Sequence, residues 1–119
     1  MKSIMCVLLI LALSATSALA AERVVKLTSL EWPPYTGESL DAEGVSAAVV
    51  KAAFAAVGVE VEISFLPWSR AVDTAKNDPE YHGYFPEYYA DSIEADFIFS
   101  DAMGSGPLGF VEQAEAPVE

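Results

Sequence analysis

Hydrophobic residues follow two different periods along the chain, and the period predicts the type of each element. Residues 23–30 (RVVKLTSL) are rich in β-branched side chains, and residues 59–66 (VEVEISFL) alternate apolar with acidic positions. Both patterns are typical of strands. Residues 45–57 and the segment that follows Pro67 instead repeat apolar residues every three to four positions, which predicts two helices.

The first predicted helix is almost entirely apolar, because Ser46 and Lys51 are the only polar residues between positions 45 and 57. We therefore expect it to be largely buried and to end at Gly58, a residue suited to the helix C-terminus. Its expected core face consists of Val45, Val49, Ala53 and Val57, with Val50 and Phe54 beside them.

The second predicted helix begins at Pro67, which is well placed in a first turn, and ends before Asp78. Its apolar and polar positions separate cleanly onto two faces, as expected for a surface helix. The expected core face contains Trp68, Ala71, Val72 and Ala75, and the polar face contains Arg70, Asp73 and Asn77.

The rest of the chain predicts shorter elements. We expect a strand over residues 81–85, a helix over 87–95, a strand over 96–100 (DFIFS) and an extended piece over 107–112. Strands and helices then alternate along the chain, which predicts an α/β fold with an open parallel or mixed sheet and helices on both faces.

The first twenty residues have the pattern of a secretory signal peptide. Lys2 precedes an apolar run over residues 4–13, and a small-x-small site follows at residues 18–20. The run is too short to cross a bilayer as a helix. We therefore expect cleavage after Ala20, export, and no stable membrane insertion of the remaining domain, residues 21–119.

Composition and charge exclude several classes of partner. The chain has 18 acidic and 6 basic side chains and a formal net charge of −12, and loss of Lys2 with the signal peptide makes it more negative still. Such a charge repels nucleic acids and anionic lipid surfaces. Because 53% of the residues are hydrophobic, we expect a compact domain and not an acidic disordered tail. Cys6 is the only cysteine, and it would leave with the signal peptide.

Motifs for cofactor binding or catalysis are weak. Residues 104–109 form a literal G-x-G-x-x-G, but Pro107 and the β-like residues after it do not open a helix, so we expect no dinucleotide site. Met103 stands where a nucleophile elbow needs glycine, so Ser105 is not a predicted nucleophile. His82 is the only histidine; a Ser-His-Asp set is formally available, but no spacing selects it. The sequence predicts no cofactor and no metal site.

Several segments in series resemble one family. They are WPPY after the first strand, a helix ending in AAVG before VEVE, then FLPWSRAVDTAK and DFIFSDAMGSGPLGF. Their order resembles that of the extracellular solute-binding proteins of family 3, the type II periplasmic binding proteins of ABC importers. The resemblance covers residues 23–111 approximately and rests on serial order, since no single motif is diagnostic.

The resemblance implies a two-lobed fold in which the chain stops near the crossing to the second lobe. We therefore expect residues 21–119 to form a truncated solute-binding domain, lobe 1 alone, with the second lobe absent. The implied function is capture of a small polar solute in the periplasm for an ABC-type importer, with its permease as a partner and without enzymatic activity. The alternatives are a dehydratase-like periplasmic enzyme on the same fold and an extracytoplasmic sensor lobe.

In this family the loop after the first strand lies at the carboxyl ends of the strands, where open α/β sheets bind ligands. Trp32 and Tyr35 are therefore candidate walls of the cleft, with packing on their own lobe as the alternative. The full set of candidate ligand-binding residues is Trp32, Tyr35, Glu87, Tyr88, Tyr89 and Ser105.

The sequence departs from the family where amino-acid binders carry a T-x-x-R segment, whose arginine pairs with the ligand carboxylate. The matching stretch, PEYYADSIEA, contains no basic residue, and Ile93 or Glu94 falls near the arginine position. Arg70 is the nearest basic residue, on the polar face of the second predicted helix. Glu87 would repel an anionic ligand and favour a cationic or neutral one, unless it merely starts the predicted helix.

Overall fold

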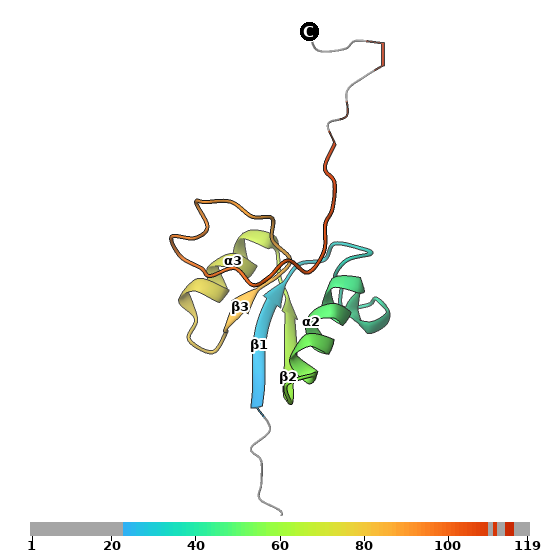
Figure 1. The fold of residues 1–119 in the computed structure, drawn as a ribbon. Coiled ribbons are helices and arrows are strands. Elements are labelled where there is room, and N and C mark those ends of the chain that lie inside the picture. The colour runs from blue at the N-terminus through green and yellow to red at the C-terminus, as the bar shows by residue number, and fades with distance from the viewer. Residues whose placement is uncertain (1–22, 110, 112–113, 116–119) are drawn as a thin grey trace, which may run out of the picture.

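The computed structural model describes residues 23–109, 111 and 114–115, so the predicted signal peptide lies outside the described residues. Within them, strands and helices alternate along the chain (Figure 1). The elements are β1 (Arg23–Ser29), a 3₁₀ turn η2 (Asp41–Glu43), α2 (Val45–Ala55), β2 (Val59–Phe65), α3 (Trp68–Asn77) and β3 (Gly83–Tyr84).

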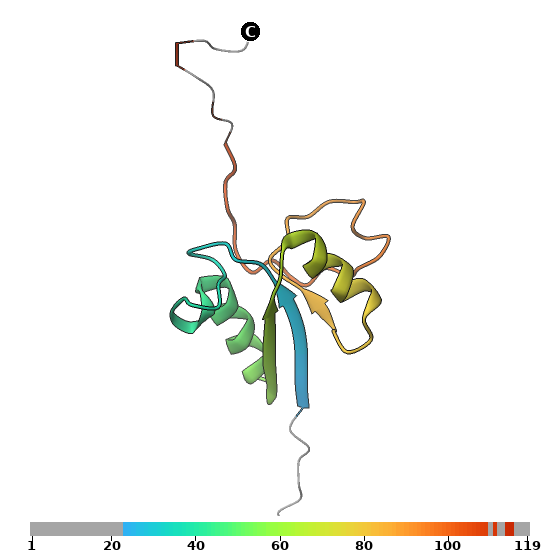
Figure 2. The same cartoon turned by 180° about the vertical axis from the view of Figure 1, so that it is seen from behind.

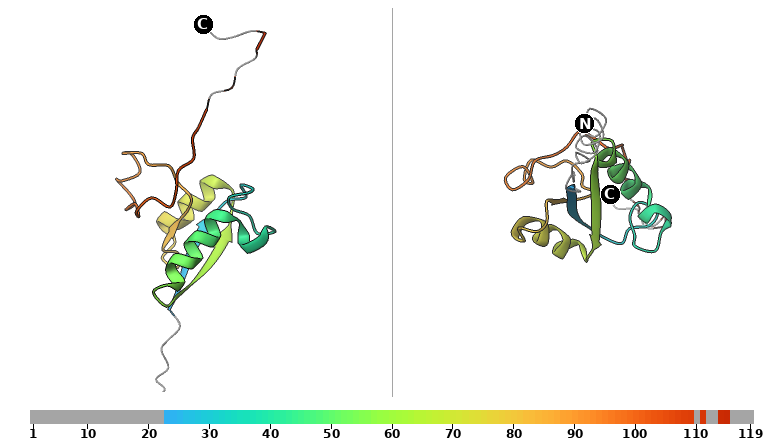
Figure 3. Two further views of the ribbon diagram at one scale, coloured as in Figure 1. Left: turned by 45° about the vertical axis from the view of Figure 1, so that its right-hand side comes forward. Right: turned by 90° about the horizontal axis from the view of Figure 1, so that it is seen from below.

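The three strands form one parallel sheet in the order β2-β1-β3. The central strand pairs with β2 along its whole length, and Leu27 lies opposite Ile63 on one side and Gly83 on the other. Helices α2 and α3 lie on opposite faces of the sheet, as Figure 2 and the right-hand view of Figure 3 show. The predicted fold class, an open α/β sheet with helices on both faces, is confirmed.

The core forms where the carboxyl-terminal half of β1 passes between the two helices. The buried hydrophobic cluster joins residues from β1, α2, β2 and the position directly after β3, and partly buried side chains of Val25, Phe54 and Ile63 pack against it. Removal of such side chains from water is the main force that holds an α/β sheet to its helices. The cluster consists of Leu27, Ala47, Val50, Val61 and Phe85.

Two fully buried hydroxyl groups fix β1 to its neighbours. Thr28 Oγ1 donates to the carbonyl of Ala71 in α3 at 2.7 Å, and Ser29 Oγ donates to the carbonyl of Phe85 at 2.8 Å. A buried hydroxyl without a hydrogen-bond partner would cost about 1–3 kcal/mol. Both side chains avoid this cost, because each donates to a carbonyl where water is excluded. They set the position of α3 and of the chain after β3 relative to the central strand.

The buried face of α2 differs from the expected one. Val45, Val49 and Val57 are exposed by 58%, 46% and 73%, whereas Ala47 and Val50 are buried. The helix is therefore not largely buried, because it packs one side on a narrow sheet and the opposite side stays in solvent. For α3 the expected polar face is confirmed, because Arg70, Asp73 and Asn77 are exposed. Three of the four expected core residues, Ala71, Val72 and Ala75, face inward, but the assignment of Trp68 to the core is wrong, since it is 37% exposed.

The chain after β3 departs most from the predictions. Strand β3 is only two residues long, the predicted helix over 87–95 is wrong, and the predicted strand over 96–100 is wrong. Turns at residues 91–96 replace the helix, and Ile98 is 99% exposed. The segment is instead anchored by Lys76 Nζ, 2.6 Å from Asp96 Oδ2. Of the expected extended piece, residues 107–109 and 111 have no strand pairing, and 110 and 112 lie outside the described residues.

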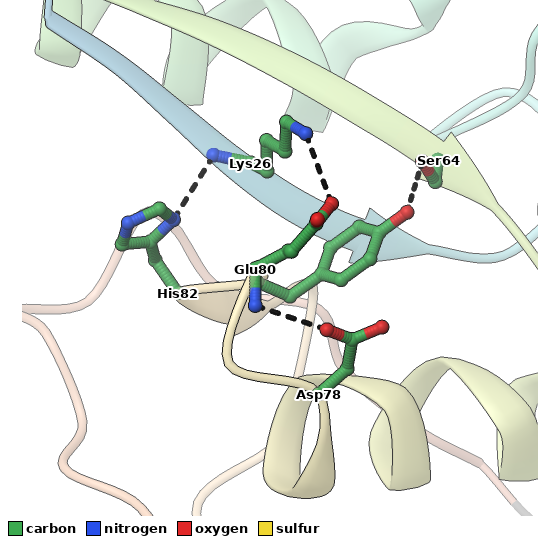
Figure 4. A network of polar contacts seen from close by, with 6 residues as sticks. Lys26, Ser64, Asp78, Glu80 and His82 are labelled. Atoms are coloured by element: carbon green, nitrogen blue, oxygen red, sulfur yellow. Dashed lines mark hydrogen bonds and ion pairs between the residues drawn. The ribbon is translucent and has the colours of Figure 1, made fainter.

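The single histidine takes part in a polar network at the start of β3 (Figure 4). The backbone amide of Lys26 donates to His82 Nδ1 at 3.2 Å, and the amide of His82 donates to the carbonyl of Lys26 at 2.9 Å. Lys26 Nζ also donates to Glu80 Oε2 at 3.3 Å, and this hydrogen bond raises the pKa of the lysine. His82 therefore extends the pairing of β3 with β1, on the side away from the carboxyl ends of the strands.

Candidate ligand-binding site

The strand order places a crevice at the carboxyl ends of β1 and β3. The chain leaves β1 toward α2 on one face of the sheet, whereas the chain after β3 runs beside α3 on the other face, where Asp96 pairs with Lys76. Neighbouring strands whose connections depart to opposite faces leave a gap between their loops, and ligands of open α/β sheets bind there. In this fold the two loops are residues 30–44 after β1 and residues 85–90 after β3.

A pocket of about 280 Å³ lies at this point. Its walls come from three separate parts of the chain: the loop after β1, the first residue of α3, and the loop after β3. The lining residues are Leu30, Trp32, Trp68, Pro86, Glu87 and Tyr88. A second hollow of about 410 Å³ lies toward β2, shares Leu30 and Trp68 with the first, and is otherwise lined by Glu31, Glu38, Phe65, Leu66 and Pro67.

The aromatic loop after β1 is held by its own hydrogen bonds. The buried Thr36 donates from Oγ1 to the carbonyl of Leu30 at 2.8 Å, and the Trp32 amide donates to the carbonyl of Thr36 at 2.8 Å. The rings of Trp32 and Tyr35 lie 4.9 Å apart, within the range of favourable aromatic contacts. The loop therefore presents Trp32 to the pocket and supports it from behind with Tyr35.

The same loop occupies the N-terminus of α2. The amide of Val45 donates to the carbonyl of Pro34 at 3.2 Å, and the amide of Ser46 donates to the carbonyl of Tyr35 at 2.9 Å. Amides at a helix N-terminus often bind anions. Here these two are already used by the protein, so they are not free to bind the carboxylate of a ligand.

Glu87 is the one charged residue that lines the 280 Å³ pocket, and two donors hold its carboxylate. Oε2 accepts from the Tyr84 hydroxyl at 3.1 Å, and Oε1 accepts from the Tyr88 amide at 2.8 Å. These two hydrogen bonds fix the orientation of the carboxylate at the pocket wall. No helix begins at Glu87, so the alternative in which it merely starts a helix is wrong.

Trp68 was not among the predicted site residues. Its ring packs edge-on against Tyr84 at 5.5 Å, and Tyr84 packs in the same way against Phe97 at 4.8 Å. Helical periodicity explains Trp68 as a core residue, yet it is 37% exposed because it stands at the end of the sheet. The sequence does contain one signal for Trp68 as a site residue: it directly follows Pro67, at the carboxyl end of β2.

The structure brings together three of the six predicted site residues. Trp32, Glu87 and Tyr88 line the same pocket, and the rings of Trp32 and Tyr88 lie 6.5 Å apart. Tyr35 contacts Trp32 from outside the lining. Tyr89 is 64% exposed and packs on Phe99 at 5.2 Å. Ser105 is exposed and does not line the pocket.

The segment after β3 nevertheless returns to the site. Figure 1 shows it crossing the carboxyl ends of the strands. A methyl group added at Gly106 would lie 3.2 Å from the hydroxyl of Tyr88, so the backbone passes close to that ring.

Partial burial raises the pKa of Tyr84 to about 12, and its hydrogen bond to Glu87 adds to the shift. Because the folded-state pKa lies above the ordinary value of 10.0, the protonated phenol stabilises the fold below pH 10, and this stabilisation is lost as the pH rises toward about 12. We expect Tyr84 to ionise last of the five tyrosines when phenolate absorbance is followed against pH, later than Tyr89, whose pKa is also raised, chiefly by a hydrogen bond to Asp91. Tyr84→Phe should remove that late component and reduce the loss of stability above pH 10. An unchanged late component in the variant would show that the late ionisation does not belong to Tyr84.

Over the described residues, no three His, Cys, Asp or Glu side chains gather closely enough to hold a metal ion. The described helices are also too short or too polar for any of them to cross a membrane. Comparison with protein-family models, with curated proteins and with solved structures found no match to the chain.

Proposed function

We propose that this domain captures a small polar organic solute at the carboxyl ends of β1 and β3. In this proposal it is the first lobe of a periplasmic solute-binding protein that serves an ABC-type importer. The observation that carries the proposal is the 280 Å³ pocket at the strand-order switch, with aromatic walls and a single oriented carboxylate. Ligand sites combine mainly apolar walls with a few fixed polar groups in this way.

The exposure of the walls supports a one-sided site. Trp32, Trp68 and Tyr88 are 37%, 37% and 44% exposed, although they are large hydrophobic residues. Large aromatic side chains that gather around a concave surface mark a place where another molecule is bound. In a two-lobed binding protein a second lobe closes over such a half-site by a hinge motion.

The two tryptophans provide a direct measurement. They are the only tryptophans of the chain, and both line the pocket, so indole fluorescence reports on this site alone. We expect a saturable change in emission with one class among amines, amino acids, sugars and dicarboxylates. Because the site is open on one side, binding in the millimolar range is expected, equivalent to about −4 kcal/mol.

A matched pair of variants gives the control. Trp32→Ala should abolish the binding, and the fluorescence of Trp68 still reports on the pocket in this variant. Tyr89→Ala removes an exposed aromatic residue outside the pocket and should leave the binding intact. The absence of a saturable response to every class would refute the proposed function. An equal loss in both variants would refute the assignment of the pocket.

A further inference from the structure

We infer that the solute is an organic cation whose charge is carried by an alkylated ammonium group. This inference rests on the proposed function, because it names the class of ligand for the same pocket. It follows from three features of the pocket: its aromatic walls, the sign of its charge, and the shortage of hydrogen-bonding groups.

Three aromatic rings from separate segments surround the pocket. Trp32 follows β1, Trp68 begins α3 and Tyr88 follows β3, and the rings of Trp32 and Tyr88 lie 6.5 Å apart at an angle of 64°. The face of an aromatic ring is negative, and tryptophan attracts cations most strongly. A cation between these rings would contact two indole groups and one phenol.

The charge of the site has one sign. Glu87 lines the pocket, and Glu31 and Glu38 line the neighbouring hollow, where the Glu38 amide donates to Glu31 Oε1 at 2.9 Å. No Lys, Arg or His is among the described residues that line either space. The local field therefore attracts cations and repels carboxylates and phosphates.

The basic residues are engaged or placed elsewhere. Arg23 begins β1 at the end of the sheet opposite the pocket, and Arg70 is exposed on α3 and lines neither space. The remaining described lysines are paired with carboxylates outside the two linings: Lys26 with Glu80, Lys51 with Glu43, and Lys76 with Asp96.

Besides Glu87, the side chains that line the pocket offer a ligand only two indole N–H groups and one phenol hydroxyl for hydrogen bonding. Leu30 and Pro86 add apolar surface to the three rings, and both carboxylate oxygens of Glu87 already accept a hydrogen bond. The hydroxyl groups of a sugar would lose water here without gaining enough partners, at a substantial cost. A methylated ammonium group needs no hydrogen-bond partner, because its charge is spread over apolar methyl surface, and it fits the walls and the carboxylate together.

The test compares choline with 3,3-dimethylbutan-1-ol, which has nearly the same shape but no charge. The protein is produced from the full chain and recovered after export, and both compounds are titrated while the tryptophan fluorescence is recorded. We expect choline to bind about tenfold more tightly than the neutral compound, in the range that cation–π and charge contacts provide. Glu87→Gln should remove most of that difference by weakening choline alone. Glu60→Gln, on the exposed side of β2, is the control and should change neither affinity.

The possible outcomes separate this inference from the proposed function. Equal binding of the two compounds, or tighter binding of a dicarboxylate such as succinate, would overturn the inference and leave the proposed function standing. Choline could still bind more tightly than the neutral compound in Glu87→Gln but not in Trp32→Ala. The ligand would then still be a cation, and the aromatic rings, not Glu87, would recognise its charge. A failure of cations, anions, sugars and amino acids alike to bind would overturn both.

Discussion

Gly44→Ala is expected to lower the free energy of unfolding by about 3 kcal/mol. Gly44 has φ +99°, a conformation that side chains with a Cβ rarely adopt. A methyl group at this position would also lie 2.4 Å from the carbonyl oxygen of Tyr35. The backbone would have to shift at the point where Val45 and Ser46 donate to the aromatic loop. The loop and the N-terminus of α2 would be disturbed together, so solute binding should weaken as well.

Gly58→Ala is the matched control. Gly58 also has a positive φ, of +73°, but an added methyl group would meet no atom within 4 Å. We expect a loss of about 1 kcal/mol, from the backbone conformation alone, with no effect on binding. Urea denaturation of the two variants measures the difference. Equal losses would show that the contact with Tyr35 contributes nothing beyond the backbone angle.

Phe85→Ala is expected to lower the free energy of unfolding by about 3–5 kcal/mol, the usual range for a core phenylalanine. Phe85 is 5% exposed and packs with Leu27, Val50 and Val61 in the core cluster, directly before the loop that carries Glu87. Small domains are typically stable by about 5–15 kcal/mol, so this one change would remove a large part of the total. Thermal and urea unfolding measure it.

Phe99→Ala provides the comparison within the same stretch of chain. Phe99 packs on the exposed ring of Tyr89, outside the core cluster, and we expect its loss to cost less than about 1 kcal/mol. A loss as large as that of Phe85→Ala would mean that residues 96–100 do form part of the core, as a paired strand would.

Local periodicity was sufficient to predict the first two strands and both helices within two residues. In β2 the alternation of Val61 and Ile63 with Glu60 and Glu62 marks the faces of the strand directly. In α2 the apolar residues surround the helix, so periodicity shows that a helix forms but cannot select the face that will be buried. The sheet makes that choice: it buries Val50, which was expected beside the core face, and Ala47, which was not expected, and leaves Val45 and Val49 exposed.

The region after β3 could not be predicted in the same way. DFIFS has the composition of a strand, but a strand exists only where a partner offers its backbone, and that depends on distant parts of the chain. The candidate site also contains both residues that could be predicted from the sequence and one that could not. Trp32, Glu87 and Tyr88 became candidates through the family resemblance, combined with the rule that ligands bind at the carboxyl ends of parallel strands. Trp68 fits the apolar face of the helical pattern, so the sequence assigns it to the core and does not reveal its position at the end of the sheet.

The Lys76–Asp96 ion pair has a consequence for how the domain opens. Both side chains are close to half exposed, so the pair contributes roughly 0–1 kcal/mol and weakens as salt is added. The contact of Phe97 with Tyr84 also holds this segment, but neither contact is part of the strand pairing. The loops of residues 91–109 can therefore detach in local fluctuations that leave the sheet whole, and more often at high ionic strength. The middle of β1 is paired with a strand on each side, so its amide hydrogens would exchange with solvent only when the whole sheet separates. One small domain would thus contain two zones of hydrogen exchange, and salt would accelerate exchange in the outer zone alone.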